Sequence, residues 1–369
     1  MNGYEFDHGL VIGKFYPPHQ GHVYLIGTAL FHCRRVSVLV LGSSSESLDM
    51  RLRAQWIRDC FPAADGLRVV AELDDAPIDF DDDDAWGVHM RVMGHALDRI
   101  AEEFNEPAYP IDAVFSSEMY GAELALRFGA RHVCLDQARA LHAVSSTGVR
   151  ADLAGHWMQL PASVRAGLAL RVAIVGAEST GTTTLARDLR DALRARGGVW
   201  ERTAWVAEYG REYSVNVLAV ARAHDPSATP HDIVWDEADF AHIAEEQTRR
   251  ENEAARASGP VLVCDTDAMA TGIWHERYLG HPSARVDALA AAMPPRALYL
   301  LTDYHAVEFE DDGLRDGEHL RAWMTERFAQ VLGAGTVPWR LVTGSREERL
   351  ASALRHLAEA MPAWWPFAG

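Results

Sequence analysis

Two passages of the chain place a short apolar run before a glycine-bearing turn and an amphipathic segment after it. In the first, residues 9–13 are apolar and a helix is expected from about Gly21. In the second, residues 171–175 are apolar apart from Arg171, residues 176–181 form the turn, and a helix is expected from Thr182. Strand, turn and helix in this order are the unit of α/β domains with parallel sheets. The pattern therefore predicts two α/β domains.

Further apolar runs complete the predicted sheets, and several of them are followed directly by a polar residue, as residues 260–264 are by Asp265. The carboxyl ends of parallel strands are where such sheets bind ligands. A chain of 369 residues also exceeds one ordinary domain. We therefore expect one domain at residues 1–167 and another at residues 168–369. The additional strands are expected at residues 35–41, 111–116, 132–135, 260–264 and 297–301.

Composition narrows the class of protein. The chain is 48% hydrophobic and 24% charged, without the run of about 18 apolar residues that a membrane helix needs. Residues 1–8 are polar and acidic, and the apolar stretch after them is too short for a signal peptide. We therefore expect a cytoplasmic protein that does not span a membrane.

Cysteine spacing and net charge exclude further classes. The four cysteines stand far apart without a CxxC pair, so neither a disulfide framework nor a zinc site is indicated. A formal net charge of -18 argues against non-specific binding to nucleic acid, because its phosphates attract basic surfaces. Phosphate ligands must therefore be held by local features of the chain.

A histidine pair, His19 and His22, follows the first strand and its proline turn at the start of a helix. This spacing places two imidazoles beside exposed backbone N–H groups at the positive end of the helix, which is an anion site. With the nearby Lys14, the pair could stabilise charge as pyrophosphate leaves the triphosphate of ATP. The alternative is a pair of surface histidines that cap a helix.

Residues 144–150 form a second motif about 125 residues later. Hydroxyl groups precede a helix start there, and Arg150 projects from its first turn. Hydroxyls with an arginine suit a polyphosphate. Each motif alone is weak evidence for a site that binds the phosphates of ATP, whereas the two motifs in this order and at this separation are a specific signal.

An acidic run at residues 74–84 is broken by Pro77 and Phe80. A solvated loop is the simpler interpretation. The alternative is that its end helps to cover a ligand, because the ring of Trp86 offers a face on which a flat pyridinium could stack.

The turn of the second passage resembles a phosphate-binding loop, because it follows a strand and opens a helix. The pattern GxxxxGK[ST] is met except that Thr182 stands where lysine is expected. Backbone amides could still hold phosphates, and Thr183 could still hold Mg²⁺, whereas a positive charge at the β and γ phosphates is missing. The expected ATP-binding residues of this loop are Gly176, Glu178, Ser179, Thr180, Gly181, Thr182, Thr183 and Thr184.

The two motifs of the first domain together resemble adenylyltransferases that act on nicotinamide mononucleotide, most closely the NadR family. The resemblance extends through residues 51–56, 115–118 and 156–161. It implies a Rossmann-like nucleotidyltransferase domain followed by a P-loop kinase-like α/β domain. It also implies that Trp86 lies near the nicotinamide, and that ATP in the first domain is bound or activated by Gly13, Lys14, Phe15, His19, Gly21, His22, Ser145, Ser146, Thr147 and Arg150.

NadR-like proteins carry a ribosylnicotinamide kinase domain in their second half, and residues 208–212, 265–267 and 310–315 fit its pattern. Glu208 could take the proton from the 5′-hydroxyl of nicotinamide riboside, and Asp265 could bind Mg²⁺. Arg315, in a candidate lid, could neutralise the transferred phosphoryl group. The simpler alternatives are an ion pair between Glu208 and Arg211 and solvated loop acids. The resemblance implies substrate-binding roles for Arg211, Asp267, Asp311 and Asp312.

The leading hypothesis is a bifunctional enzyme that phosphorylates nicotinamide riboside and adenylylates the product to NAD, with two ATP sites and Mg²⁺ as cofactor. A second hypothesis keeps the transferase and makes the second domain an inactive nucleotide sensor. A third, a transcriptional regulator with an added helix-turn-helix, is disfavoured because the first strand begins near residue 9 and the chain is acidic. The expected partners are ATP, nicotinamide mononucleotide and nicotinamide riboside, without nucleic acid or membrane. The sequence leaves open whether the chain forms a homo-oligomer.

Overall fold

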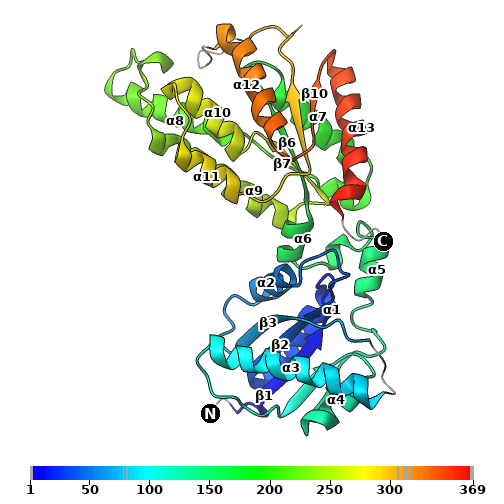
Figure 1. Ribbon diagram of the computed structural model, residues 1–369. Coiled ribbons are helices and arrows are strands. Elements are labelled where there is room, and N and C mark those ends of the chain that lie inside the picture. The colour runs from blue at the N-terminus through cyan, green and yellow to red at the C-terminus, as the bar shows by residue number, and fades with distance from the viewer. Residues whose placement is uncertain are drawn as a thin grey trace. The chain divides into compact units, whose positions relative to one another are not determined.

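The computed structural model describes residues 3–77, 79, 82–305, 307–310, 315 and 317–365. The chain forms two compact units, residues 3–164 and Arg165–Trp365, and each is described by itself. Both are α/β units with a parallel sheet, which confirms the predicted fold class (Figure 1). Within the described residues, no helix is both long and apolar enough to cross a membrane.

The first unit has a five-stranded parallel sheet in the order β3-β2-β1-β4-β5. The order reverses at β1, because the chain first adds strands on one side and then on the other. In such sheets the crevice at this switch point binds ligands. The strands are β1 (Phe6–Gly13), β2 (Cys33–Gly42), β3 (Leu67–Leu73), β4 (Ala113–Ser116) and β5 (Arg131–Cys134).

Helices cover both faces of this sheet, because successive strand residues point to opposite sides. Val11 packs in one buried cluster with residues of α1 and α2. Its neighbour Leu10 packs in another cluster with residues of α3 and α4. The helices are α1 (Gln20–His32), α2 (Met50–Cys60), α3 (Asp83–Glu103), α4 (Gly121–Phe128) and α5 (Ser146–Ala151), with the short helix η1 (Trp157–Gln159). The next helix, α6 (Ala162–Leu168), contains the boundary between the two units.

The second unit has a five-stranded parallel sheet in the order β10-β9-β6-β8-β7. Its central strand β6 is buried along its whole length, as its sequence, apolar except for the buried Arg171, indicates. The strands are β6 (Leu170–Val175), β7 (Ala204–Val206), β8 (Val261–Asp265), β9 (Leu298–Thr302) and β10 (Trp339–Val342).

The main core of the second unit lies between this sheet and the helices α7 and α13. Helices α9 and α12 pack on the strands as well, and α8, α10 and α11 pack with α9 or with one another (Figure 1). The helices are α7 (Thr182–Arg194), α8 (Tyr209–His224), α9 (Glu237–Ala257), α10 (Ala268–Leu279), α11 (Ala284–Ala292), α12 (Arg321–Ala334) and α13 (Arg346–Trp364), with η2 (Gly198–Arg202), η3 (Pro230–Asp232) and η4 (Glu318–Leu320).

Candidate functional site

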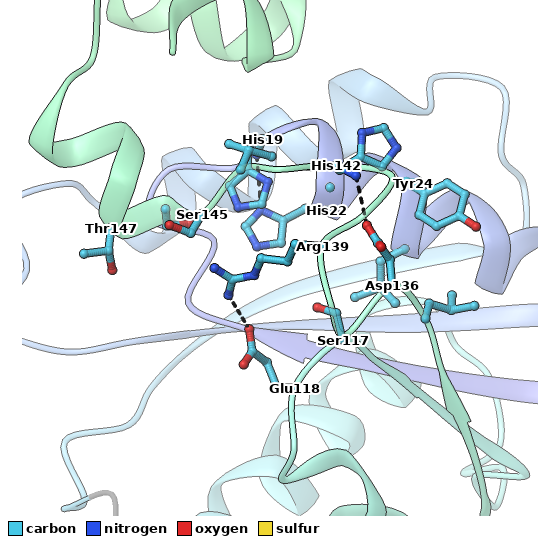
Figure 2. Close-up of a pocket in the computed structure, with 15 residues that line it drawn as sticks. His19, His22, Tyr24, Ser117, Glu118, Asp136, Arg139, His142, Ser145 and Thr147 are labelled. Atoms are coloured by element: carbon cyan, nitrogen blue, oxygen red, sulfur yellow. Dashed lines mark hydrogen bonds and ion pairs between the residues drawn. The ribbon is translucent and has the colours of Figure 1, made fainter. Parts of the chain in front are cut away.

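The first unit has a pocket of about 200 Å³ at the switch point of its sheet. It lies beside the start of α1, and Figure 2 shows the histidine pair facing across it towards the loop after β5. Its walls come from the segment after β1 and from the segments after β4 and β5, which are the two sides of the crevice between β1 and β4. The lining residues are His19, Gly21, His22, Tyr24, Leu25, Ser117, Glu118, Leu135, Asp136, Arg139, His142, Val144, Ser145, Ser146 and Thr147.

His19 and His22 form one stacked unit at the start of α1. Their ring centroids are 3.7 Å apart, and the backbone N–H of His19 donates to Nδ1 of His22 over 3.2 Å. His19 is 6% exposed, and its buried Nδ1 has no hydrogen-bond partner among the described residues. An unpartnered buried ring nitrogen is costly unless a ligand completes it. The ring of His19 thus keeps a hydrogen-bonding group that a polar ligand of the pocket could satisfy.

Burial also fixes the charge of this pair. Burial, with the positive charge of Arg139 and His142, lowers the pKa of His19 to about 4. Burial, His19 and Arg139 lower the pKa of His22 well below its usual value. We therefore expect both rings to be neutral near pH 7 and to contact a ligand through hydrogen bonds. A bound phosphate would raise both pKa values, because a nearby negative charge favours the imidazolium.

The second motif folds against the loop that carries the histidines. Ser146 donates from Oγ to the backbone oxygen of Pro17 over 3.0 Å, and Arg150 donates to that of Tyr16 over 2.6 Å. The Arg150 guanidinium also lies 4.8 Å from the Tyr16 ring centroid. Ser145 caps α5 by accepting from the backbone N–H of Gly148 over 3.0 Å. The structure therefore brings together two motifs that are about 125 residues apart.

Other residues expected at this site do not line the pocket. Lys14 pairs with Glu46 over 3.0 Å, and the ring of Phe15, which is 2% exposed, contacts His22 edge-on. Gly13 and Arg150 are not among the residues that line the pocket. Trp86 is 5% exposed in the core cluster that also holds Leu10. The nicotinamide role of Trp86 stays a prediction.

Sequence reasoning missed the loop of residues 136–142. Asp136 accepts backbone N–H groups of Ala140, Leu141 and His142, with distances of 2.6 to 3.2 Å. This closed turn presents Arg139, which donates to Glu118 over 3.0 Å (Figure 2). The only sequence signal is an aspartate directly after a strand, which is common in turns.

The second unit has a larger pocket of about 550 Å³ around the phosphate-loop segment. It contains the predicted loop residues Gly176, Glu178, Ser179, Gly181, Thr182, Thr183 and Thr184. It also contains Glu208, Arg211, Asp265 and Arg315, which sequence reasoning had placed together. Asp311 and Asp312 lie outside the described residues.

The loop after β6 has the backbone that its glycines predict. Gly181 has φ +85°, and a side chain at Gly176 would place its Cβ 2.2 Å from Oγ1 of Thr302. The buried Thr180 does not line the pocket; it donates to the backbone oxygen of Ala177 over 2.8 Å. Glu178 binds Arg277 over 3.0 Å. Hydrogen bonds of these side chains thus hold the loop in place, while the threonines in the first turn of α7 line the pocket.

Two carboxyl groups with raised pKa values face this pocket. Burial and then the charge of Asp265 raise the pKa of Glu208 to about 7, although Arg211 and Arg315 oppose the shift. Burial raises the pKa of Asp265 to about 6, against a hydrogen bond from Thr183. A carboxyl that titrates near neutral pH can serve as a general base.

The residues present fit a magnesium ion. The Thr183 hydroxyl and the Asp265 carboxylate lie within hydrogen-bond contact at the phosphate loop, and Mg²⁺ prefers such oxygen ligands. Groups of three or more His, Cys, Asp or Glu that could hold a metal are absent from the part of the chain that the structure describes. This is compatible with Mg²⁺, which commonly takes one or two protein ligands, with substrate phosphates and water for the rest.

Aromatic side chains form the wall of the pocket beyond Glu208, and sequence reasoning missed them. Trp235 and Tyr278 lie 5.6 Å apart between ring centroids, and Trp274 stacks on Tyr278 at 6.4 Å. Such a wall suits a flat, electron-poor ring. The side chains come from separate helices and loops, so no local motif marks them. The aromatic residues that line the pocket are Trp205, Trp235, Phe240, Trp274 and Tyr278.

Asp267 lies in the core of the second unit, apart from the pocket-lining residues. Its carboxylate accepts from Oη of Tyr299 over 2.7 Å, from Arg296 over 3.2 Å and from the backbone N–H of Ala270 over 3.0 Å. It therefore caps α10 and joins a buried network. Its substrate-binding role stays a prediction.

A switch-point pocket with paired histidines and a phosphate loop with facing carboxyls define a two-unit α/β protein with a nucleotide-binding P-loop-type domain. Residues 171–349 match the AAA domain family AAA_28. The chain is 25% identical over 298 residues to the "Trifunctional NAD biosynthesis/regulator protein NadR" of Escherichia coli (strain K12), covering 76% of this chain and 65% of the relative. The NadR of Salmonella typhimurium is 26% identical over the same shares. The chain thus spans about 65% of the length of these curated relatives.

Solved NadR structures have the same fold. A "NadR protein in complex with NR" has a TM-score of 0.64 at 20% identity, covering 97% of this chain and 96% of that one. A "NadR protein in complex with NAD and AMP-PNP" has a TM-score of 0.59 at 19% identity, covering 97% of each chain. The chain is a homologue of the NadR proteins, which confirms the resemblance found in its motifs.

Proposed function

We propose that the chain is a bifunctional enzyme of NAD biosynthesis. Residues 168–369 would phosphorylate nicotinamide riboside with ATP, and residues 1–167 would join the resulting mononucleotide to an adenylyl group. The observation that carries the proposal is the second pocket, where a phosphate loop, a carboxyl with a pKa near neutrality and an aromatic wall face one cavity. The NadR homologues, with their complexes of NR, NAD and AMP-PNP, support it.

In the kinase reaction, the oxygen of the riboside 5′-hydroxyl attacks the γ-phosphorus of ATP. The bond between that phosphorus and the bridging oxygen breaks, and ADP leaves with the electron pair. Glu208 takes the hydroxyl proton, for which its pKa of about 7 is suited. Arg315 and Arg211 line the same cavity and oppose the negative charge that develops. Magnesium held by Thr183 and Asp265 would neutralise phosphate charge when bound.

In the transferase reaction, a phosphate oxygen of the mononucleotide attacks the α-phosphorus of ATP, and pyrophosphate leaves. The nucleophile is already ionised, so a general base is unnecessary. His19 and His22 would donate hydrogen bonds to the phosphate oxygens from a site that is already organised. Arg139 adds a positive charge at the rim of the same pocket.

The aromatic wall gives the kinase its proposed specificity. Nicotinamide is flat and cationic in the riboside, and tryptophan and tyrosine faces attract such rings. Trp235, Trp274 and Tyr278 line the cavity together with Glu208. The riboside would thus lie with its ring against this wall and its 5′-hydroxyl towards Glu208. A solved NadR protein that binds NR supports this choice of substrate.

Thr182 favours an alternative, in which the second domain senses adenine nucleotide without turnover, because the lysine of the phosphate-loop pattern is absent. The test is incubation of the whole chain with nicotinamide riboside, ATP and Mg²⁺, with chromatography of all products. NAD with both ADP and pyrophosphate supports two active domains. If NAD forms only from added mononucleotide, the kinase proposal is wrong and the sensor alternative stands.

A further inference from the structure

Two buried arginines hold the phosphate loop from its carbonyl side. Arg349, on the first turn of α13, is 6% exposed. Its guanidinium donates to the backbone oxygens of Thr180 over 2.7 Å, Asp303 over 2.9 Å and Gly344 over 2.9 Å. One side chain thus joins the phosphate loop to the segments that follow β9 and β10.

Arg321, at the start of α12, makes the equivalent contact one residue earlier in the loop. It is 7% exposed, and its Nη2 donates to the backbone oxygen of Ser179 over 3.1 Å. The same nitrogen donates to Tyr304 O over 3.0 Å and to Val307 O over 2.9 Å. Successive loop carbonyls therefore each bind a separate buried cation.

Within the described residues, neither guanidinium is neutralised by an ion pair. Among the described carboxylates, none lies within 4.0 Å of Arg321 or Arg349. The pKa of Arg349 is lowered by burial and by Arg321, with Asp303 opposing. Asp303 itself is held by His305, whose Nδ1 lies 2.7 Å from its carboxylate. Burying two neighbouring cations is costly where, as among the described side chains, no acid pairs with them, and this cost points to a use for their charge.

The peptide groups of the loop connect these charges to the pocket. A peptide dipole has its positive end at N–H and its negative end at C=O, and phosphate loops bind anions through N–H groups. A cation on the carbonyl oxygen offsets the negative end and polarises the peptide, which leaves the N–H side more positive. In this chain, Thr182 supplies no such charge from its own side chain.

We propose that Arg321 and Arg349 are positioning residues that supply, through the peptide groups of the loop, the positive charge that a lysine at position 182 would otherwise provide. This inference rests on the proposed kinase function. Other cations near the loop have different contacts. Arg187 is exposed and lies 4.7 Å from the Trp205 ring centroid, and Arg315 binds Glu310 over 2.7 Å.

The test compares nucleotides that differ in phosphate number. Binding of AMP and of AMP-PNP with Mg²⁺ to the whole chain is measured by calorimetry, and the site of the second domain is the one that Thr183→Ala weakens. Arg349→Met should weaken AMP-PNP about tenfold and AMP much less, because the lost charge acts on the β and γ phosphates. It should also lower kinase kcat, while adenylylation of added mononucleotide stays unchanged.

Adding the lysine separates charge from mere structural support. Thr182→Lys in the Arg349→Met background should restore most of the lost AMP-PNP affinity and kcat. Arg346→Met is the matched control, because Arg346 is exposed on the same turn of α13 and binds Asp188 instead of the loop. It should leave the preference for AMP-PNP over AMP unchanged.

Each outcome of these measurements either supports or overturns the inference. Equal weakening of AMP and AMP-PNP, or no recovery with Thr182→Lys, would overturn the inference. If Arg349→Met does not fold, Arg321→Met undergoes the same comparison with the same criteria. If the unaltered chain shows no kinase activity, the proposed function fails, whereas the ratio of the two nucleotide affinities still tests the role of the arginines.

Discussion

The negative charge of Asp265 is, after burial, the largest influence that raises the pKa of Glu208, and the two side chains line one pocket. Glu208 directly precedes α8, and Asp265 is the last residue of β8. The two side chains come together because β7, which leads into α8, is paired with β8. Titration of Glu208 near pH 7 would make the proposed kinase reaction sensitive to pH within the physiological range.

We expect kinase kcat to rise with pH through about 7, because Glu208 accepts a proton only when ionised. Glu208→Gln should lower kcat about 10² to 10⁴-fold, as removal of a general base usually does. The measurement is riboside-dependent ADP release from pH 5.5 to 8.5. Glu212→Gln is the control, since Glu212 is on the same helix and binds Arg250. An unchanged pH profile in Glu208→Gln would refute the assignment.

The same carboxyl should reduce stability at high pH. Its pKa of about 7 in the folded chain exceeds the usual value of 4.5, so the folded state binds the proton more tightly. Its contribution to stability is therefore fully present below about pH 4.5 and is lost as pH rises through about 7. Glu208→Gln should then raise the melting temperature more at pH 8 than at pH 5.5, relative to the unaltered chain. Thermal melts without nucleotide test this.

The sheets were predictable because most of their strands are largely apolar runs, several of them followed by a polar residue. The expected strand at residues 260–264 is β8 (Val261–Asp265), and the run at residues 171–175 lies within β6 (Leu170–Val175). The phosphate loop was predictable for a related reason, since its backbone needs glycine at Gly181, with φ +85°. Local physical constraints of this kind leave a trace in the sequence.

The aromatic wall and the two loop-binding arginines were not predictable, because tertiary packing alone defines them. Trp235 and Trp274 belong to separate segments, and nothing in the residues around either marks a ring site. Arg349 looks like one more charged residue of an amphipathic helix, yet it is 6% exposed and binds three backbone oxygens. The charge of the histidine pair was also hidden, because burial lowers the pKa of His19 to about 4.

We expect His22→Ala to lower adenylyl transfer by about 10² to 10⁴-fold, because organised hydrogen-bond donors at a reacting phosphate are lost. The kinase activity of the same variant should be unchanged, since the second pocket is separate. His32→Ala is the matched control, because His32 ends the same helix and pairs with Glu5. Pyrophosphate release from mononucleotide and ATP is the readout, and near-normal turnover in His22→Ala would remove the histidine pair from the mechanism.

The last prediction concerns the hydroxyl that we assign to Mg²⁺. Thr183 is the second residue of α7 and hydrogen-bonds to the carboxylate of Asp265. Thr183→Ala should raise the Mg²⁺ concentration needed for half-maximal kinase rate and lower kcat, because one oxygen ligand is lost. Thr183→Ser keeps the hydroxyl and should stay close to the unaltered chain. Adenylylation of added mononucleotide should be the same in both variants. If Thr183→Ala reduced the two activities equally, the domains would not act as independent sites, and the assignment of separate ATP sites would have to be abandoned.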